Sequence, residues 1–211
     1  MTEHRTLLAC GEHAVLVDVG GLDEVLALAH AVREAVAAAT PGFAQVVDII
    51  PAATTVLVVV ADGAGVAALR QALATLPAAE PGNAATRDHI IEIPVRYDGP
   101  DLTEVSEITG LSVDEVIAAH TGTSWRVAFG GFAPGFAYLS GLEVSVPRLA
   151  TPRTRVPPGS VALAGTWCGI YPGPSPGGWQ VIGTTDAVLW DPRRAQPALL
   201  APGTRVRFVA R

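Results

Sequence analysis

The stretch HTGTSWRVAFGGFAPGFAYLSGL, residues 120–142, decides how the C-terminal half of the chain folds. The glycines at 130, 131, 135 and 141 stand among Phe132, Phe136 and Tyr138, so the backbone can turn sharply while it presents aromatic rings. The structural alternative is that the rings only fill a core and the glycines only make turns. Short β-like runs separated by Pro and Gly turns surround the stretch, which predicts a compact β-barrel. The expected strands are residues 125–129, 160–164, 178–184, 188–190 and 205–209.

The part of the chain before this stretch alternates β-like and helical patterns. Strands are expected at residues 14–19, 45–50, 54–60 and 90–95, and amphipathic helices at 22–36 and 66–76. The order β-α-β-β-α-β is the split βαβ, or ferredoxin-like, pattern, in which two helices cover one face of an antiparallel sheet. We therefore predict an α+β chain with a ferredoxin-like N-terminal domain at residues 1–86 and a β-barrel domain at residues 87–211.

Two short helices are expected between these parts, over about residues 101–121. The segments 101–104 (DLTE) and 112–115 (SVDE) both fit the capping box, in which the first side chain bonds a free backbone N–H and the fourth reaches back. Gly110 and Gly122 are the expected stops, because glycine adopts the left-handed C-terminal conformation without steric cost.

Composition excludes several classes of function. The net charge is −6 and the 14 Lys and Arg residues are scattered, so a nucleic-acid partner is not expected. The apolar stretch 22–39 contains four charged residues, and no stretch is long and apolar enough for a membrane span. The first ten residues lack the apolar core of a signal peptide, so we expect a cytoplasmic protein.

Metal and disulfide chemistry have no support in the sequence. Cys10 and Cys168 are far apart and belong to no CxxC pair, so we expect two unpaired thiols and no metal site. Phosphate-loop, HExxH and G-x-S-x-G motifs are also missing, which argues against a self-sufficient hydrolase.

A proline-stiffened cationic segment follows the aromatic stretch. Arg148, Arg153 and Arg155 fall within eight positions, between prolines that restrict the backbone. Guanidinium groups on a rigid loop suit carboxylate or phosphate recognition, although a solvated loop or internal ion pairs would give the same pattern. A second stiff loop, residues 169–180, places Tyr171, Trp179 and Gln180 around turns, and its alternative is a structural loop pinned by the tryptophan.

Long motifs across the chain resemble the B-type component of prokaryotic 5-oxoprolinase, a family also described as allophanate hydrolase subunit 1 and as KipI-type sporulation-kinase inhibitors. The resemblance covers essentially the whole chain. It lies in GEHA at 11–14, GFAPGFAYLSGL at 131–142, the Pro-Arg pairs at 147 and 152, RVPPGSVALAG at 155–165, IYPGPSPGGWQVIGTT at 170–185 and PGTRVRF at 202–208.

This resemblance implies a ferredoxin-like domain followed by a cyclophilin-like β-barrel. It also implies partners, a C-type subunit with a related barrel and an A-type subunit, and an ATP-driven opening of the 5-oxo-L-proline lactam to L-glutamate. The implied cofactor is ATP, bound by the assembled complex, with no activity expected from this chain alone. Alternatives are a subunit of an allophanate hydrolase or urea carboxylase-type carboxyltransferase, and a non-enzymatic histidine-kinase inhibitor.

On this basis we assign candidate site residues. The candidate catalytic residues are His120, as a proton handler, and Ser160, as a polar contact; a lone histidine can equally be a structural residue. Arg153 and Arg155 are the candidate anion ligands. Tyr138, Trp179 and Gln180 are expected to line the substrate pocket.

Overall fold

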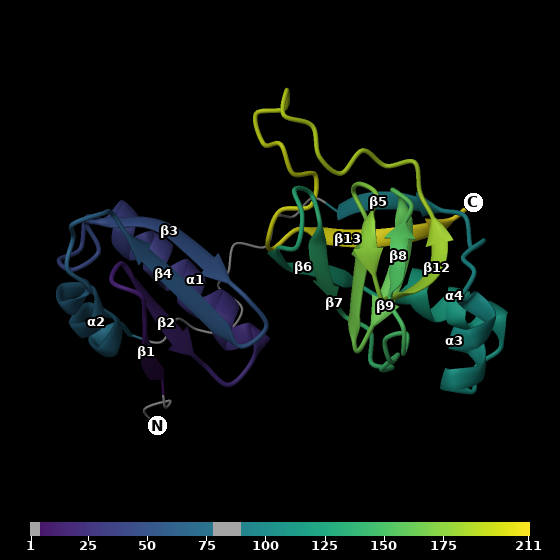
Figure 1. The fold of residues 1–211 in the computed structure, drawn as a ribbon, viewed down its shortest axis with the longest axis horizontal. Coiled ribbons are helices and arrows are strands. Elements are labelled where there is room, and N and C mark those ends of the chain that lie inside the picture. The colour runs from purple at the N-terminus through teal and green to yellow at the C-terminus, as the bar shows by residue number, and fades with distance from the viewer. Residues whose placement is uncertain (1–4, 78–89) are drawn as a thin grey trace. The chain divides into compact units, whose positions relative to one another are not determined.

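The computed structural model describes residues 5–77 and 90–211. The chain divides into two compact units, Met1–Ala85 and Thr86–Arg211. Figure 1 shows a helix-backed sheet in the first unit and a curved, barrel-like sheet in the second. None of the helices in the described part of the chain is long and apolar enough to cross a membrane.

The first unit is a four-stranded antiparallel sheet with two helices. Its strands follow the spatial order β1-β2-β4-β3. The elements are β1 (Thr6–Cys10), β2 (Ala14–Asp18), α1 (Leu22–Ala37), β3 (Val46–Pro51), β4 (Thr55–Val60) and α2 (Val66–Thr75). Both helices pack on the same face of the sheet, because alternate strand residues such as Val15 and Val58 share one buried cluster with Val25 of α1 and Leu69 of α2. The predicted helices and the predicted hairpin of β3 and β4 are confirmed.

The strand predicted at residues 90–95 is confirmed, but its predicted place in the first sheet is wrong. Residues Ile90–Val95 form β5, which pairs in parallel with β13 (Arg205–Ala210) in the second unit. The sheet position beside β2 is occupied instead by β1, whose residues Thr6–Cys10 pair antiparallel with Asp18–Ala14. An alternating apolar pattern identifies a strand but not the sheet it joins, which explains the error. The first unit is therefore a sheet covered by two helices, and β1 is the edge strand beside β2.

The second unit is a seven-stranded sheet that nearly closes into a barrel. Its strand order is β12-β9-β10-β7-β6-β13-β5. The strands not yet given are β6 (Trp125–Gly130), β7 (Ala137–Ser140), β9 (Ser160–Ala164), β10 (Trp167–Ile170) and β12 (Gln180–Thr184). A separate two-stranded sheet pairs β8 (Arg153–Val156) with β11 (Ser175–Gly177), and the helices are α3 (Leu102–Thr109) and α4 (Val113–Gly122).

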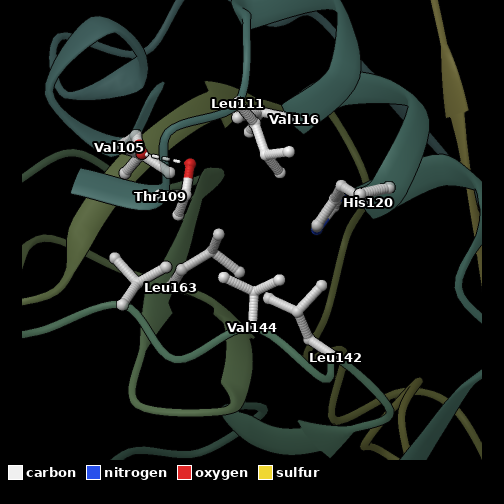
Figure 2. Close-up of a pocket in the computed structure, with 10 residues that line it drawn as sticks. Val105, Thr109, Leu111, Val116, His120, Leu142, Val144 and Leu163 are labelled. Carbon is white, nitrogen blue, oxygen red and sulfur yellow. Dashed lines mark hydrogen bonds between the residues drawn. The ribbon is translucent and has the colours of Figure 1, made fainter. Parts of the chain in front are cut away.

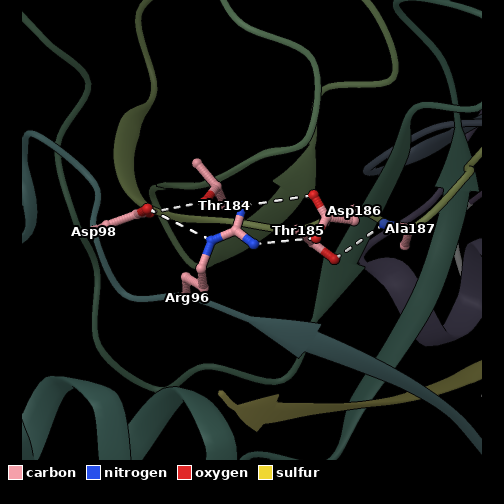
Figure 3. A network of polar contacts seen from close by, with 6 residues as sticks. All are labelled: Arg96, Asp98, Thr184, Thr185, Asp186 and Ala187. Carbon is pink, nitrogen blue, oxygen red and sulfur yellow. Dashed lines mark hydrogen bonds and ion pairs between the residues drawn. The ribbon is translucent and has the colours of Figure 1, made fainter.

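The two edges of the large sheet meet through Arg96 and Thr184, whose backbones form an antiparallel bridge at 2.9 and 2.8 Å. Side chains reinforce this seam. Figure 3 shows the Arg96 guanidinium between Asp98 and Asp186, with the Thr184 hydroxyl donating to Asp98 at 2.8 Å. The backbone N–H of Gly99 continues the seam by donating to the carbonyl of Ile182 at 3.2 Å.

Side chains alternate between the interior and the outer face of this barrel. Trp125, Leu139, Leu163 and Phe208 belong to the buried cluster of the interior. Intervening residues of β9, Ala162 and Ala164, belong to a second cluster on the outer face, together with Tyr171 and Trp179. The aromatic residues that the sequence placed in one group are thus divided between two faces of one sheet.

Four of the five predicted barrel strands are confirmed, with small changes of length. The exception is residues 188–190, which lie in a loop and make only an isolated bridge between Trp190 and Ala198. The capping box at Ser112 is confirmed, and Gly110 ends α3 in the left-handed conformation with φ 72°. The box at Asp101 is wrong, because this side chain makes no cap hydrogen bond. Gly122 is the last residue of α4, but it does not adopt the expected left-handed conformation, and the residue that caps the helix is Thr123.

Candidate functional site

Aromatic side chains gather on the outer face of the barrel, where the loops around β7, β10 and β12 meet. Phe136 is central: its ring centroid lies 5.1 Å from that of Tyr138, 5.6 Å from Tyr171 and 5.5 Å from Trp179, all in edge-to-face geometry. Such contacts favour fixed ring positions. The local sequence explains the assembly, because β7 alternates Ala137 and Leu139 inward with Tyr138 outward.

These rings form the wall of an open pocket of about 110 Å³. One cation lines it: the Arg148 guanidinium carbon lies 6.0 Å from the centroid of the Trp179 ring, within cation–π range. The lining residues are Phe132, Phe136, Tyr138, Arg148, Tyr171, Pro176, Gly177, Gly178 and Trp179. We call this the aromatic pocket. Its size and composition suit a small, flat, anionic molecule.

Phe132 forms the exposed rim of the aromatic pocket. It has φ 66°, a left-handed conformation that is uncommon outside glycine, and 59% of its surface is accessible. Edge contacts at 5.3 Å with Phe136 and 6.1 Å with Tyr171 hold the ring in place. A strained backbone that exposes a large apolar ring beside a pocket is typical of a binding site.

Tyr171 forms the floor and stays protonated, because burial raises the pKa of its hydroxyl group. Its ring packs directly against Gly177, where any Cβ atom would overlap the phenol oxygen. Glycine at this position is therefore required for the ring to reach its place. The lining of the pocket holds guanidinium and phenol groups but no carboxylate or imidazole, so it can bind and orient a ligand and lacks a general base of its own.

Arg153 lies in an internal ion pair. Its two terminal nitrogens donate to both carboxylate oxygens of Asp101 at 2.9 and 2.5 Å, and the backbone N–H of Val181 donates to the same carboxylate at 2.6 Å. Asp101 is 3% exposed. The bidentate pair therefore connects the start of α3 with β8 and β12. Because its guanidinium is engaged by Asp101, Arg153 positions these elements and is not a free anion ligand.

The remaining binding candidates lie in different environments. Arg155 is exposed on β8, and no described residue pairs with its guanidinium. Gln180 is buried and pairs with Leu163 on the interior side of the sheet, so it does not line the aromatic pocket beside Trp179. Ser160 is buried at the start of β9, opposite Thr184. Of the sequence-based set, only Tyr138 and Trp179 come together at this pocket.

His120 belongs to α4, and its side chain is buried in the core with 1% exposure. Its Nδ1 lies 2.7 Å from the Tyr97 hydroxyl and its Nε2 lies 3.4 Å from Cys168 Sγ, while the ring stacks on Phe208 at 4.3 Å. Burial lowers the pKa of the imidazole to about 3 and raises the pKa values of the Tyr97 and Cys168 side chains, so all three groups are neutral near pH 7.

A small cavity beside His120 does not change this interpretation. Figure 2 shows the imidazole among aliphatic side chains, with Leu142 and Val144 on one side and Val116 on another. The cavity measures about 20 Å³ and its lining is almost wholly apolar, so it offers a water molecule few hydrogen bonds. The geometry supports a structural role for His120, and this residue does not line the aromatic pocket. In residues 5–77 and 90–211, no group of three or more His, Cys, Asp or Glu side chains could hold a metal ion.

A family model described as the carboxyltransferase domain, subdomain C and D, matches residues 5–200. The chain belongs to this family. Two curated members similar to this chain are both named as the B-type component of 5-oxoprolinase: the protein of Escherichia coli O157:H7 is 49% identical over 124 residues, and that of Bacillus subtilis is 47% identical over 125 residues. The matched segments cover 56% and 57% of this chain, and 57% and 52% of those proteins. The chain thus spans about half the length of the curated relatives it matches.

Several solved structures have a similar fold. TTHA0988 is 38% identical with a TM-score of 0.76, and the match covers 99% of this chain and 40% of that one. The conserved uncharacterized protein PH0987 of Pyrococcus horikoshii is 33% identical with a TM-score of 0.57, over 98% of this chain and 97% of that one. Urea carboxylase of Kluyveromyces lactis is 16% identical with a TM-score of 0.75, over 99% of this chain and 22% of that one, which shows a shared fold alone.

Sequence reasoning did not select the pocket residues Phe132, Phe136, Arg148 and Tyr171 as site candidates. Arg148 could have been selected from the sequence, because it follows Pro147 in the same cationic segment as the candidate anion ligands Arg153 and Arg155. Phe132 and Tyr171 stood within the quoted motifs, but nothing local distinguishes a ring on the pocket wall from a ring in the core. Only the strand register, which places Tyr138 opposite Phe129 on the outer face, makes that distinction.

Proposed function

We propose that this chain is the B-type subunit of an ATP-dependent 5-oxoprolinase, which hydrolyses 5-oxo-L-proline to L-glutamate together with A-type and C-type subunits. The names and 46–49% identity of three curated relatives support this assignment. The structural observation that carries it is the aromatic pocket with Arg148 beside Trp179.

The chemistry of the substrate fits this pocket. 5-Oxoproline is a small, nearly flat lactam ring with one carboxylate. Aromatic rings can pack against the faces of the lactam, and the Arg148 guanidinium can pair with the carboxylate. Tyr138 and Tyr171 also line this pocket.

ATP is the co-substrate in this proposal. An unactivated amide opens slowly, and transfer of the terminal phosphoryl group to the amide oxygen makes the ring carbon a better electrophile for water. The pocket of this chain contributes binding, orientation and positive charge near developing anionic groups. A general base and the remaining walls come from the partner subunits, so the isolated chain is inactive.

Reconstitution tests the proposal. The chain is purified alone and with its A-type and C-type partners, and ADP and glutamate are measured in the presence and absence of 5-oxoproline. We expect 5-oxoproline-dependent release of both products only when all subunits are present. Equal turnover in a complex that lacks this chain would refute the assignment.

The same preparations distinguish the alternatives. A requirement for a biotinylated protein, with urea or allophanate as substrate, would indicate carboxyl transfer. Inhibition of a histidine kinase by the chain, without any turnover in the complex, would indicate a regulator.

A further inference from the structure

Three arginines lie together on the outer face of the barrel. Val206 and Phe208 of β13 point into the interior. Because side chains alternate along a strand, Arg205 and Arg207 point outward. Arg126 of β6 points outward for the same reason, and it lies directly opposite Arg205 in the antiparallel register. None of these residues lines the aromatic pocket.

The positive charge of this group is only partly neutralised. Glu92 of β5 lies beside Arg207 in the parallel register and forms an ion pair with it. In the described part of the chain, no carboxylate pairs with Arg126 or Arg205. Like charges directly opposite each other on neighbouring strands are destabilising, so this pair is unfavourable unless an anion lies between or beside the two guanidinium groups.

Arg126 gives a second, independent indication. Its Nε and Nη2 atoms are enclosed by protein and have no hydrogen-bond partner, whereas Nη1 is not enclosed in this way. Leaving donors of a charged group without partners is costly, and such groups usually signal a missing water or ion. An anion that reaches Nη1 would compensate the charge of a guanidinium that is already largely removed from water.

We propose that Arg126 and Arg205 form a binding site for a dianionic oxyanion, either inorganic phosphate or the terminal phosphate of a nucleotide. Two unneutralised guanidinium groups match a charge of two. The exposed fork of Arg205 can hold two oxygens of a tetrahedral anion, and Arg126 can donate to it through Nη1. This inference does not rest on the 5-oxoprolinase assignment, because it uses residues outside the aromatic pocket.

Calorimetric titration of the full chain tests the site, with inorganic phosphate, ATP and acetate as separate ligands and chloride holding the ionic strength constant. We expect saturable binding of phosphate, and acetate binding at least about tenfold weaker, since a monoanion leaves one guanidinium unpaired. Binding of ATP without binding of phosphate would identify a nucleotide as the source. Absence of saturable binding for both phosphate and ATP would overturn the proposal, as would acetate binding as tightly as phosphate.

Substitutions assign the binding to these residues. Arg126→Gln and Arg205→Gln should each weaken phosphate binding at least about tenfold, the effect of one charged hydrogen-bonding partner. Arg193→Gln is the matched control, because it removes one positive charge from an exposed loop where Arg193 pairs with Asp191. Unchanged binding in Arg205→Gln, or an equal loss in Arg193→Gln, would contradict the site. Arg205 is exposed, so its variant remains informative if Arg126→Gln does not fold.

Discussion

Arg153 holds Asp101 with two parallel hydrogen bonds across 52 positions of sequence, and the same carboxylate accepts the backbone N–H of Val181. This contact fixes the start of α3, the strand β8 and the start of β12 to one another. Trp179, on the wall of the aromatic pocket, comes two residues before Val181. The ion pair therefore supports the pocket without lining it.

Arg153→Ala should lower the free energy of unfolding by about 2–3 kcal/mol, because it leaves the Asp101 carboxylate buried without its cation. The value lies below that of a fully buried pair, since the Arg153 side chain is partly exposed. Urea denaturation measures the change. Arg96→Ala, which breaks an exposed ion pair with Asp186, is the control and should have a much smaller effect. An equal loss in both variants would argue against this role of the buried carboxylate.

Burial of neutral His120 should make the chain less stable as the pH falls. The folded-state pKa of about 3 is below the unfolded value of 6.5, so between these values only the unfolded chain binds the proton. Stability then decreases as the pH falls from 6.5, by at most about 1.4 kcal/mol per unit of pH. Denaturation at several values between pH 7 and pH 5 measures this slope. His120→Gln should flatten it, and an unchanged slope in that variant would assign the pH dependence to other groups.

The seam of the barrel should not tolerate a side chain at Gly99. A Cβ atom there would overlap backbone atoms of Val181, Ile182 and Gly183 on the opposite edge. Gly99→Ala should therefore destabilise the chain by about 2 kcal/mol or more, as measured by thermal or urea unfolding. Gly122→Ala is the matched control, because the space around this last residue of α4 is open, and it should not destabilise the chain. A neutral Gly99→Ala variant would mean that the edges of the sheet are not held together at this point.

Local patterns predicted the elements better than their pairing. The period of apolar residues identified α1 and the β3–β4 hairpin, because each depends on contacts near in sequence. Strand β5 was found in the sequence but assigned to the wrong sheet, since its partner β13 lies more than 100 positions away. The chain before Gly11 was not recognised as a strand, although it supplies the edge of the first sheet.

The candidate site shows the same limit. The segment 101–104 has the spacing of a capping box, but the Asp101 carboxylate is used by Arg153 and Val181, which no local pattern reveals. Arg153 and Arg148 look equivalent in the sequence. In the folded chain Arg153 pairs with Asp101, whereas Arg148 lies over the Trp179 ring. Only these three-dimensional contacts distinguish the two roles.

Arg155 stays a candidate anion ligand on the exposed face of β8. Arg155→Ala should weaken ligand binding by the assembled complex by about 1.5–3 kcal/mol if its guanidinium meets a charged group there. The fold should be unaffected, because the side chain is exposed. Substrate titration of the complex measures the effect, and unchanged binding would remove Arg155 from the site.

The most direct test of the account is the KM for 5-oxoproline of the complete complex with Arg148→Gln. The variant removes the single cation of the aromatic pocket and should raise KM about tenfold or more, with a smaller change in kcat, because the carboxylate contact serves binding. Arg33→Gln, on the exposed side of α1, controls for the loss of one charge. If KM stays the same in the Arg148 variant, the aromatic pocket is not where 5-oxoproline binds.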